Sequence, residues 1–238
     1  MNQKHQIDIA VSFPAVRFEE DQLFSLELFR QLDYLAVEKY YLPIELMMEN
    51  AGWQLSRLVM AVYTEPCDVY IGIGKGNNGG GGLVAARRLL ARGYRVWLDL
   101  PDEALSGLPA IQLERSLQFG AKKGFPPKPA ILVDAWLGFS QRLPLPDTLN
   151  EKIKHCNQLL IPRIALDIPT GFHPQSKDNY FKADLICCLA APKKILAHLL
   201  TNSRIFIADL GIPDQIYMEN NISYHFPKNN AGLFEWTS

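Results

Sequence analysis

The chain alternates short apolar runs with longer amphipathic stretches. Short runs rich in β-branched and aromatic residues predict strands over 69–73, 95–100, 130–136, 163–168, 184–190 and 205–209. Apolar residues at helical spacing predict helices over 20–39, 44–63, 83–92, 108–119, 147–157 and 192–201. This alternation is typical of βα repeats, so we expect an α/β fold: a three-layer αβα Rossmann-like sandwich with a mostly parallel central sheet.

No linker is long or polar enough to divide the chain. We therefore predict one domain over 1–238, in which 1–20 forms an N-terminal arm and 214–238 a tail without a clear pattern. In a parallel sheet, ligands bind at the carboxyl ends of the strands, where loops enter the helices. The segments that follow the first, third and fourth predicted strands are therefore the ones to inspect.

The composition is that of an ordinary globular protein, with 48% hydrophobic and 21% charged residues. A formal net charge of −1 gives no electrostatic reason to expect nucleic acid or an anionic membrane as a partner. No apolar run reaches the roughly 18 residues that a membrane span requires. The cysteines show neither CxxC spacing nor a disulfide framework, which favours a reducing, cytoplasmic location; Cys187 and Cys188 are expected to be buried.

Glycine dominates the segment 72–82, directly after the first predicted strand. Glycine permits positive φ and lets backbone N–H groups approach an anion closely. The helix that follows would direct the positive end of its dipole at the same anion. We therefore predict phosphate or nucleotide binding here, with a flexible connection as the alternative.

Three of these glycines, Gly74, Gly76 and Gly79, satisfy the GxGxxG spacing of dinucleotide-binding folds. Asp99, 20 residues beyond Gly79, would then hold a ribose hydroxyl. This interpretation leaves room for an ordinary NAD-dependent oxidoreductase. No constellation for hydride transfer accompanies the spacing, however, and the two asparagines followed by four glycines are not part of it.

Two further acids end predicted strands. Asp134 closes the third, and Asp167 closes the fourth, where Pro169, Thr170 and Gly171 follow. An acid at such a position either caps the next helix or meets a ligand. Two carboxylates with nearby amide and hydroxyl oxygens also suit a hard cation, because hard cations prefer oxygen ligands.

Taken together, these segments resemble the NAD(P)HX epimerase family, the YjeF N-terminal domain. The resemblance runs in order from about residue 25 to residue 215. Its motifs are MENAG at 48–52, GNNGGGGLVAAR at 76–87, VDA at 133–135 followed by Gly138, LDIPTG at 166–171, and ADL at 183–185 followed by APK at 191–193. The GNNGG segment combined with LDIPTG is highly specific.

The resemblance implies an enzyme, often dimeric, that interconverts the R and S epimers of hydrated NADH or NADPH. By motif, contacts to the dinucleotide would come from Asn77, Asn78, Gly79, Gly80, Gly81, Gly138, Phe139, Ser140, Gln141, Arg142, Leu143 and Pro144. The resemblance also places Asp167 against the hydrated nicotinamide. It also implies that Asn78, Asp134 and Thr170 bind a potassium ion.

Inverting the hydroxyl-bearing ring carbon requires proton transfer to oxygen and stabilisation of a cationic, iminium-like centre. A positioned carboxylate can serve both needs. We therefore predict that Asp167 is the catalytic acid/base group and that Asp134, with the bound cation, sets its position and pKa.

The chain departs from the family at Gly81, where the GGDG motif has Asp. A carboxylate is lost at the mouth of the site, and we expect the glycine to add flexibility there. A catalytically degenerate nucleotide-binding or scaffold relative is therefore the alternative function. We interpret the remaining conspicuous side chains as structural: Lys193 and Lys194 as a solvated pair, and Trp53, Trp97 and Trp136 as core residues.

Overall fold

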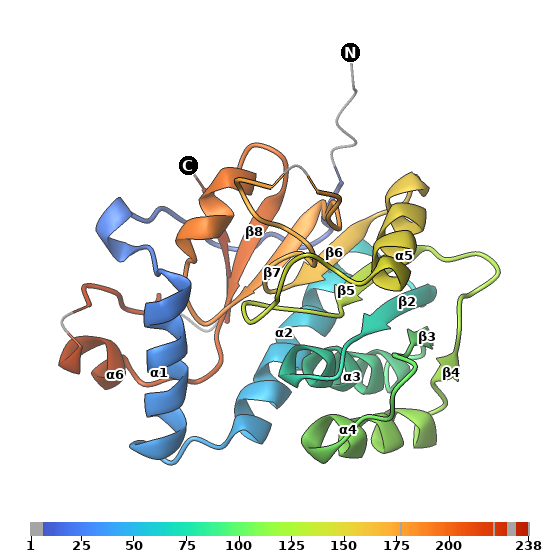
Figure 1. The fold of residues 1–238 in the computed structure, drawn as a ribbon, viewed down its shortest axis with the longest axis horizontal. Helices are drawn as coiled ribbons and strands as arrows, with labels where there is room; N and C mark the ends of the chain where they lie inside the picture. The colour runs from blue at the N-terminus through green and yellow to red at the C-terminus, as the bar shows by residue number, and fades with distance from the viewer. Residues whose placement is uncertain (1–6, 177, 221, 228–231, 238) are drawn as a thin grey trace.

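A computed structural model describes residues 7–176, 178–220, 222–227 and 232–237, and its described strands form a single sheet (Figure 1). The strands are β1 (Ala15–Val16), β2 (Asp68–Ile73), β3 (Arg95–Asp99), β4 (Lys122–Lys123), β5 (Ile131–Ala135), β6 (Arg163–Leu166), β7 (Leu185–Leu189), β8 (Arg204–Ala208) and β9 (Leu233–Trp236). Their order across the sheet is β1-β9-β8-β7-β6-β5-β2-β3-β4. Neighbours run parallel except β8 and β9, so the mostly parallel sheet is confirmed.

Helices cover both faces of this sheet. They are α1 (Leu26–Glu38), α2 (Ile44–Val62), α3 (Asn77–Leu90), α4 (Gly107–Gln118), α5 (Asp147–Gln158) and α6 (Asp214–Glu219), with 3-10 turns η1 (Glu20–Gln22) and η2 (Lys194–Leu199). Successive strand side chains enter opposite cores, as the strand period of two requires. On β2, Ile71 belongs to the core that includes residues of α2 and α3, while Tyr70 belongs to the core that includes residues of α5 and η2. The predicted αβα sandwich is confirmed.

The predicted strands are confirmed to within two residues at their ends, and so are the helices at 44–63, 108–119 and 147–157. The helix predicted over 20–39 starts late. Ser25 caps α1, accepting a hydrogen bond from Leu28 N at 3.1 Å, and Phe24 pairs with Lys193 as an isolated bridge. The segment 192–201 forms only the 3-10 turn η2.

The prediction that a loop precedes the helix at 83–92 is wrong. α3 begins at Asn77, so the consecutive glycines form its first turns. No glycine from Gly72 to Gly82 has positive φ. The ability of glycine to adopt positive φ therefore does not explain why this segment is rich in glycine. Gly93, by contrast, has φ of 86° just past the helix, where the sequence predicted its end.

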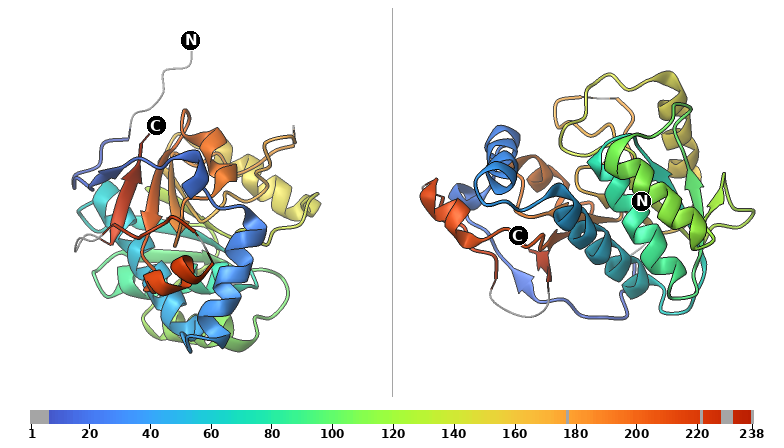
Figure 2. Two further views of the ribbon diagram at one scale, coloured as in Figure 1. Left: turned by 90° about the vertical axis from the view of Figure 1, so that its left-hand side faces the viewer. Right: turned by 90° about the horizontal axis from the view of Figure 1, so that it is seen from below.

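The two ends of the described chain meet at one edge of the sheet. β1 pairs in parallel with β9, and Ala10 N donates to Ala61 O at 2.8 Å, so the described part of the predicted arm is docked. The tail supplies both α6 and β9. Residues 1–6, 221, 228–231 and 238 of these two segments lie outside the described residues. Figure 2 shows α1 beside α6, which together flank the sheet at this side.

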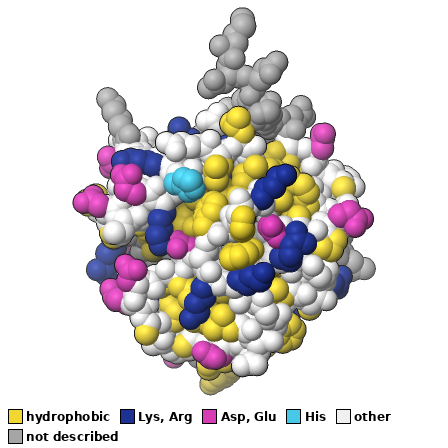
Figure 3. Space-filling view, turned by 90° about the vertical axis from the view of Figure 1, so that its right-hand side faces the viewer, with side chains coloured by type: hydrophobic (Ala, Val, Ile, Leu, Met, Phe, Trp, Pro, Cys, Tyr) yellow, Lys and Arg dark blue, Asp and Glu magenta, His cyan; other side chains and the backbone are white. Residues whose placement is uncertain are grey.

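The surface carries charges of both signs. On the face shown in Figure 3, Lys and Arg side chains lie among hydrophobic and acidic ones rather than in one continuous stripe. Among the described residues, no helix is long and apolar enough to cross a membrane. The four cysteines are all free, and Cys187 and Cys188 are buried as predicted.

Candidate active site

A cavity of about 580 Å³ opens at the carboxyl ends of β2 and β5. The chain runs from β2 to β3 on one side and returns to β5 on the other, so the strand order reverses between β2 and β5. Such switch points are where parallel sheets bind ligands, because the two loops diverge there. The volume is within the range of about 300–1,000 Å³ for small-molecule sites.

Glycines let the first turn of α3 approach the sheet and its loops. A Cβ on Gly79 would lie 1.9 Å from Gly74 O, and one on Gly82 would lie 2.5 Å from Ala135 Cβ. At Gly74, a Cβ would lie 1.6 Å from Trp136 O. These glycines are therefore required by close packing. Gly76, where a Cβ would meet nothing within 4 Å, leaves open space beside the helix start.

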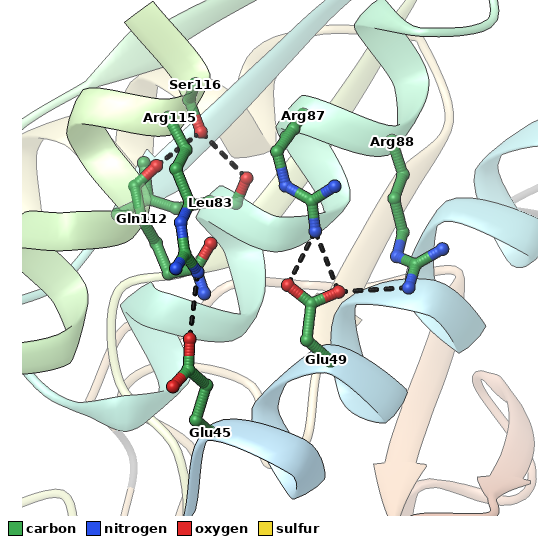
Figure 4. Close-up of polar contacts among 8 residues, drawn as sticks. All are labelled: Glu45, Glu49, Leu83, Arg87, Arg88, Gln112, Arg115 and Ser116. Atoms are coloured by element: carbon green, nitrogen blue, oxygen red, sulfur yellow. Dashed lines mark hydrogen bonds and ion pairs between the residues drawn. The ribbon is translucent and has the colours of Figure 1, made fainter.

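The MENAG segment lies on α2 and fixes α3 in place. Glu49 accepts hydrogen bonds from Arg87 at 2.5 Å and Arg88 at 2.9 Å, bridging the two helices (Figure 4). A Cβ on Gly52 would lie 2.4 Å from Val84, so this glycine also allows the close crossing. Glu49 and its two arginine partners thus hold the helix whose first turn borders the cavity.

Asp134 is fully buried behind the cavity and is held by Thr170. Its carboxylate accepts hydrogen bonds from Thr170 N at 2.7 Å, Thr170 Oγ1 at 2.6 Å and Trp136 N at 3.2 Å. Burial raises the pKa of Asp134 to about 7, although these hydrogen bonds act in the opposite direction. In the described part of the chain, Asp134 forms no ion pair, so its charge there is offset by hydrogen bonds alone.

Asn78 lies beside this group. Its amide nitrogen donates to Leu137 O at 2.7 Å and to Leu166 O at 3.2 Å. Leu137 N in turn donates to Thr170 Oγ1 at 3.1 Å. Asn78, Asp134 and Thr170 are therefore brought together around buried oxygen atoms, with one carboxylate among them.

Asp167 lies on the cavity wall and forms a buried ion pair that the sequence analysis missed. Lys193 Nζ is 2.8 Å from Asp167 Oδ1, and both side chains are almost fully buried, at 0% and 1% exposed. The prediction that Lys193 is solvated is wrong; only Lys194 is exposed. Burial lowers the pKa of Lys193, but Asp167 and Cys188 raise it above its ordinary value overall. Lys193 therefore remains a cation.

The backbone holds Asp167 tightly. Its φ is 66°, in the left-handed region that a non-glycine residue rarely adopts. Its carboxylate also accepts from Phe139 N at 3.0 Å and from Leu189 N at 3.4 Å. Both oxygens are thus engaged, which fixes the orientation of the carboxylate on the wall.

Several of the predicted site residues line the cavity together: Asn77, Asn78, Gly81, Gly138, Phe139, Ser140, Gln141 and Asp167. Others do not lie on its wall: Gly79, Gly80, Arg142, Leu143, Pro144, Asp134 and Thr170. Gly80 packs on Met48 instead, where a Cβ would lie 2.6 Å from the thioether. Whether either set contacts a nucleotide stays a prediction. Gly81 lies buried inside α3, so the expected flexibility there is wrong.

Asp99 does not reach the cavity. It accepts a hydrogen bond from Trp136 Nε1 at 3.1 Å and pairs with Lys152 at 2.8 Å. Asp99, which the GxGxxG interpretation predicted to bind a ribose hydroxyl, therefore contacts Trp136 and Lys152 instead. Trp136 is buried and borders the cavity, whereas Trp53 and Trp97 are only half-buried, beneath Arg88 and Lys122.

The cavity also takes residues from α1 and α2 that the sequence analysis did not select: Phe29, Arg30, Asp33, Ile44, Met47, Met48 and Ala51. A usable signal existed for Asp33. It follows Phe29 by four residues and adjoins Leu32, so it places a carboxyl beside the buried side of α1.

The fold and the cavity place this chain among αβα proteins whose parallel sheet opens a cavity at its switch point. The family described as YjeF-related protein N-terminus matches residues 44–195. The chain belongs to this family.

Curated relatives and a solved structure agree with this assignment. An NAD(P)H-hydrate epimerase of Rhodopirellula baltica is 32% identical over 81% of this chain and 86% of that protein. An NAD(P)H-hydrate epimerase of Dehalogenimonas lykanthroporepellens is 30% identical over 88% of this chain and 90% of that protein. The crystal structure of yeast ynu0 matches 90% of this chain and 99% of that chain with a TM-score of 0.79; at 21% identity it shows the same fold.

Proposed function

We propose that the protein is an NAD(P)H-hydrate epimerase, which interconverts the R and S epimers of hydrated NADH and NADPH. The observation that carries this proposal is the cavity itself, which joins the GNNGG helix start, the loop after β5 and Asp167 at one switch point. Relatives named NAD(P)H-hydrate epimerase match most of the chain and support the same reaction.

The start of α3 suits the phosphates of a dinucleotide. The first hydrogen bond inside this helix runs from Gly80 N to Gly76 O at 3.1 Å, so the N–H groups of 77–79 precede it. Such groups and the helix dipole favour an anion. Arg30 adds a positive charge at the cavity, 5.8 Å from the ring of Phe139. We place the pyrophosphate between α3 and Arg30.

Asp167 would face the hydrated nicotinamide ring, with Asp134 behind it as a positioning residue. Losing hydroxide from the ring carbon leaves an iminium-like cation, and a fixed carboxylate nearby favours this charge. Lys193, paired with Asp167, holds that carboxylate in place.

A potassium ion fits the oxygen atoms around Asn78, Asp134 and Thr170. Asp134 is buried without an ion pair among the described residues, and a bound cation would offset its charge. Within the described residues, no three His, Cys, Asp or Glu side chains gather to hold a metal, so the proposed cation would be held by one carboxylate and neutral oxygen atoms. When bound, the ion would supply positive charge that orders Asp134 and Thr170.

The test follows a purified epimer of NADHX by NMR or chiral chromatography in potassium buffer, with and without the protein. We expect the protein to speed the approach to the R/S equilibrium, and Asp167→Asn to reduce the enzymatic rate about 100-fold. Undiminished turnover by Asp167→Asn would remove its catalytic role.

Bound nucleotide without acceleration would point instead to a degenerate relative. The next variant would then be Gly81→Asp, which restores the missing carboxylate. A Cβ at this position would lie 3.0 Å from Leu166 Cδ2 and 3.7 Å from Ala51 Cβ, so only a small shift of the leucine is needed.

A further inference from the structure

Asp33 places a carboxyl group on the wall of the cavity. It lies on α1, outside the segment matched by the family, and is half-buried. In the described part of the chain its side chain makes no hydrogen bond and no ion pair. Asp167, the other carboxylate on this wall, has both oxygens engaged by Phe139, Leu189 and Lys193. Asp33 is therefore the carboxyl that remains free to bond a ligand.

The charges around Asp33 come from three elements. Lys193, which follows β7, lies 3.8 Å from the ring of Phe29, one turn before Asp33 on α1. Asp167, which follows β6, pairs with that lysine, and Arg30 lies on α1 itself. Burial raises the pKa of Asp33; Lys193 lowers it and Asp167 raises it, and the result is a pKa above the usual value.

We propose that Asp33 is the proton-transfer residue of the epimerisation, an inference that rests on the function proposed above. The protonated carboxyl of Asp33 donates its proton to the hydroxyl on the ring carbon. The carbon–oxygen bond breaks, water leaves, and the ring nitrogen shares its electron pair to form the iminium. Water then adds to the opposite face of the ring, and its surplus proton returns to Asp33. No electrons are gained or lost overall.

The surroundings suit both forms of this group. Desolvation and Asp167 favour the protonated carboxyl, which a general acid needs before the bond breaks. Lys193 favours the carboxylate that remains after the proton has left. On this proposal Asp33, rather than Asp167 as the sequence analysis predicted, exchanges the proton, and the carboxylate of Asp167 stays paired with Lys193.

The test compares Asp33→Asn with Glu38→Gln, which removes the same charge from an exposed position on the same helix. For Asp33→Asn we expect the enzymatic kcat for NADHX epimerisation to fall about 100-fold while KM changes less than about threefold. Glu38→Gln should match the wild type. A wild-type rate in Asp33→Asn would overturn the proposal.

Two further readouts separate proton transfer from a structural role. In Asp33→Ala, added formate should restore part of the rate in proportion to its acid form, and the acidic group should disappear from the pH–rate profile. Absence of rescue in a variant that melts like the wild type, with an unchanged pH profile, would contradict the role. If the wild type itself fails to accelerate epimerisation, it is the proposed function that fails.

Discussion

The ion pair between Asp167 and Lys193 is the most constrained pair of residues in the site. Each side chain is almost wholly buried, and Lys193 also donates to Leu189 O at 2.7 Å and stacks on Phe29. A buried pair adds little net stability compared with apolar residues, but removing one partner leaves an uncompensated charge. The ion pair therefore fixes the position of the Asp167 carboxylate more than it raises the stability of the protein.

We expect Lys193→Met to lower the free energy of unfolding by about 3–5 kcal/mol at neutral pH. The pKa of Lys193 is raised in the folded protein, so its contribution is complete below the unfolded pKa and is lost as pH rises through the folded value. Urea unfolding from pH 7 to pH 11 should show the two proteins converging above about pH 10.5. A constant difference across this range would contradict the assignment. Lys194→Met, at the exposed neighbour, is the control.

Asp134 gives a second prediction for a single residue. If a monovalent cation offsets its buried charge, potassium chloride should raise the melting temperature more than tetramethylammonium chloride at equal ionic strength. Asp134→Asn should remove this difference, because the neutral amide has no charge to offset. Equal melting temperatures of the wild type in both salts would count against the cation site.

At the scale of elements, the crossing of α2 and α3 decides where the GNNGG segment lies. Gly52 on one helix and the glycines of the other let the backbones approach, and Glu49 ties them through Arg87 (Figure 4). Glycine is a poor helix former, costing about 1 kcal/mol per residue relative to alanine. The helical start of α3 therefore depends on packing rather than on local preference.

Gly79→Ala and Gly76→Ala form a matched pair that tests this packing. The new Cβ at position 79 would lie 1.9 Å from a backbone oxygen, whereas at position 76 it would meet nothing within 4 Å. We expect a loss of about 3 kcal/mol in the free energy of unfolding for the first variant and about 1 kcal/mol for the second, which loses only the preference of the helix N-cap for glycine over alanine. Equal stabilities in urea unfolding would show that α3 can shift.

At the scale of the whole molecule, the cavity joins segments that are distant in the chain. α1 and α2 precede the first central strand, yet they close the cavity that the loops after β2, β5 and β6 open. A ligand in this cavity would therefore contact α1 and the strand loops together, and would add to the contacts that Phe29 and Arg30 already make with Phe139.

Hydrogen exchange measures this coupling. With NADPH as the probe at about 100 times its Kd, the free energy of unfolding should rise by about 2.7 kcal/mol. Amides of α1 and the start of α3 should exchange more slowly than without the nucleotide, while those of β4, the edge strand beyond β3, should change little. Protection confined to α4 would place the ligand elsewhere.

The sequence by itself determined the layers, the positions of the strands β2, β3, β5, β6, β7 and β8, and the three chemical segments. It did not predict β1, β4 or β9. Apolar periodicity reports burial directly. Asp134 lies near the end of β5 and Asp167 directly follows β6, and these neighbouring parallel strands end at the same edge of the sheet. Only the tertiary structure showed that Lys193 is buried, because two adjacent lysines predict a solvated pair until the buried partner, Asp167, is known. Likewise, the glycines of α3 suggest a loop by local propensity, and only contact with Gly74, Met48 and Ala135 makes them helical. The place of Asp33 on the cavity wall depends on how α1 docks against the sheet, which no local pattern encodes.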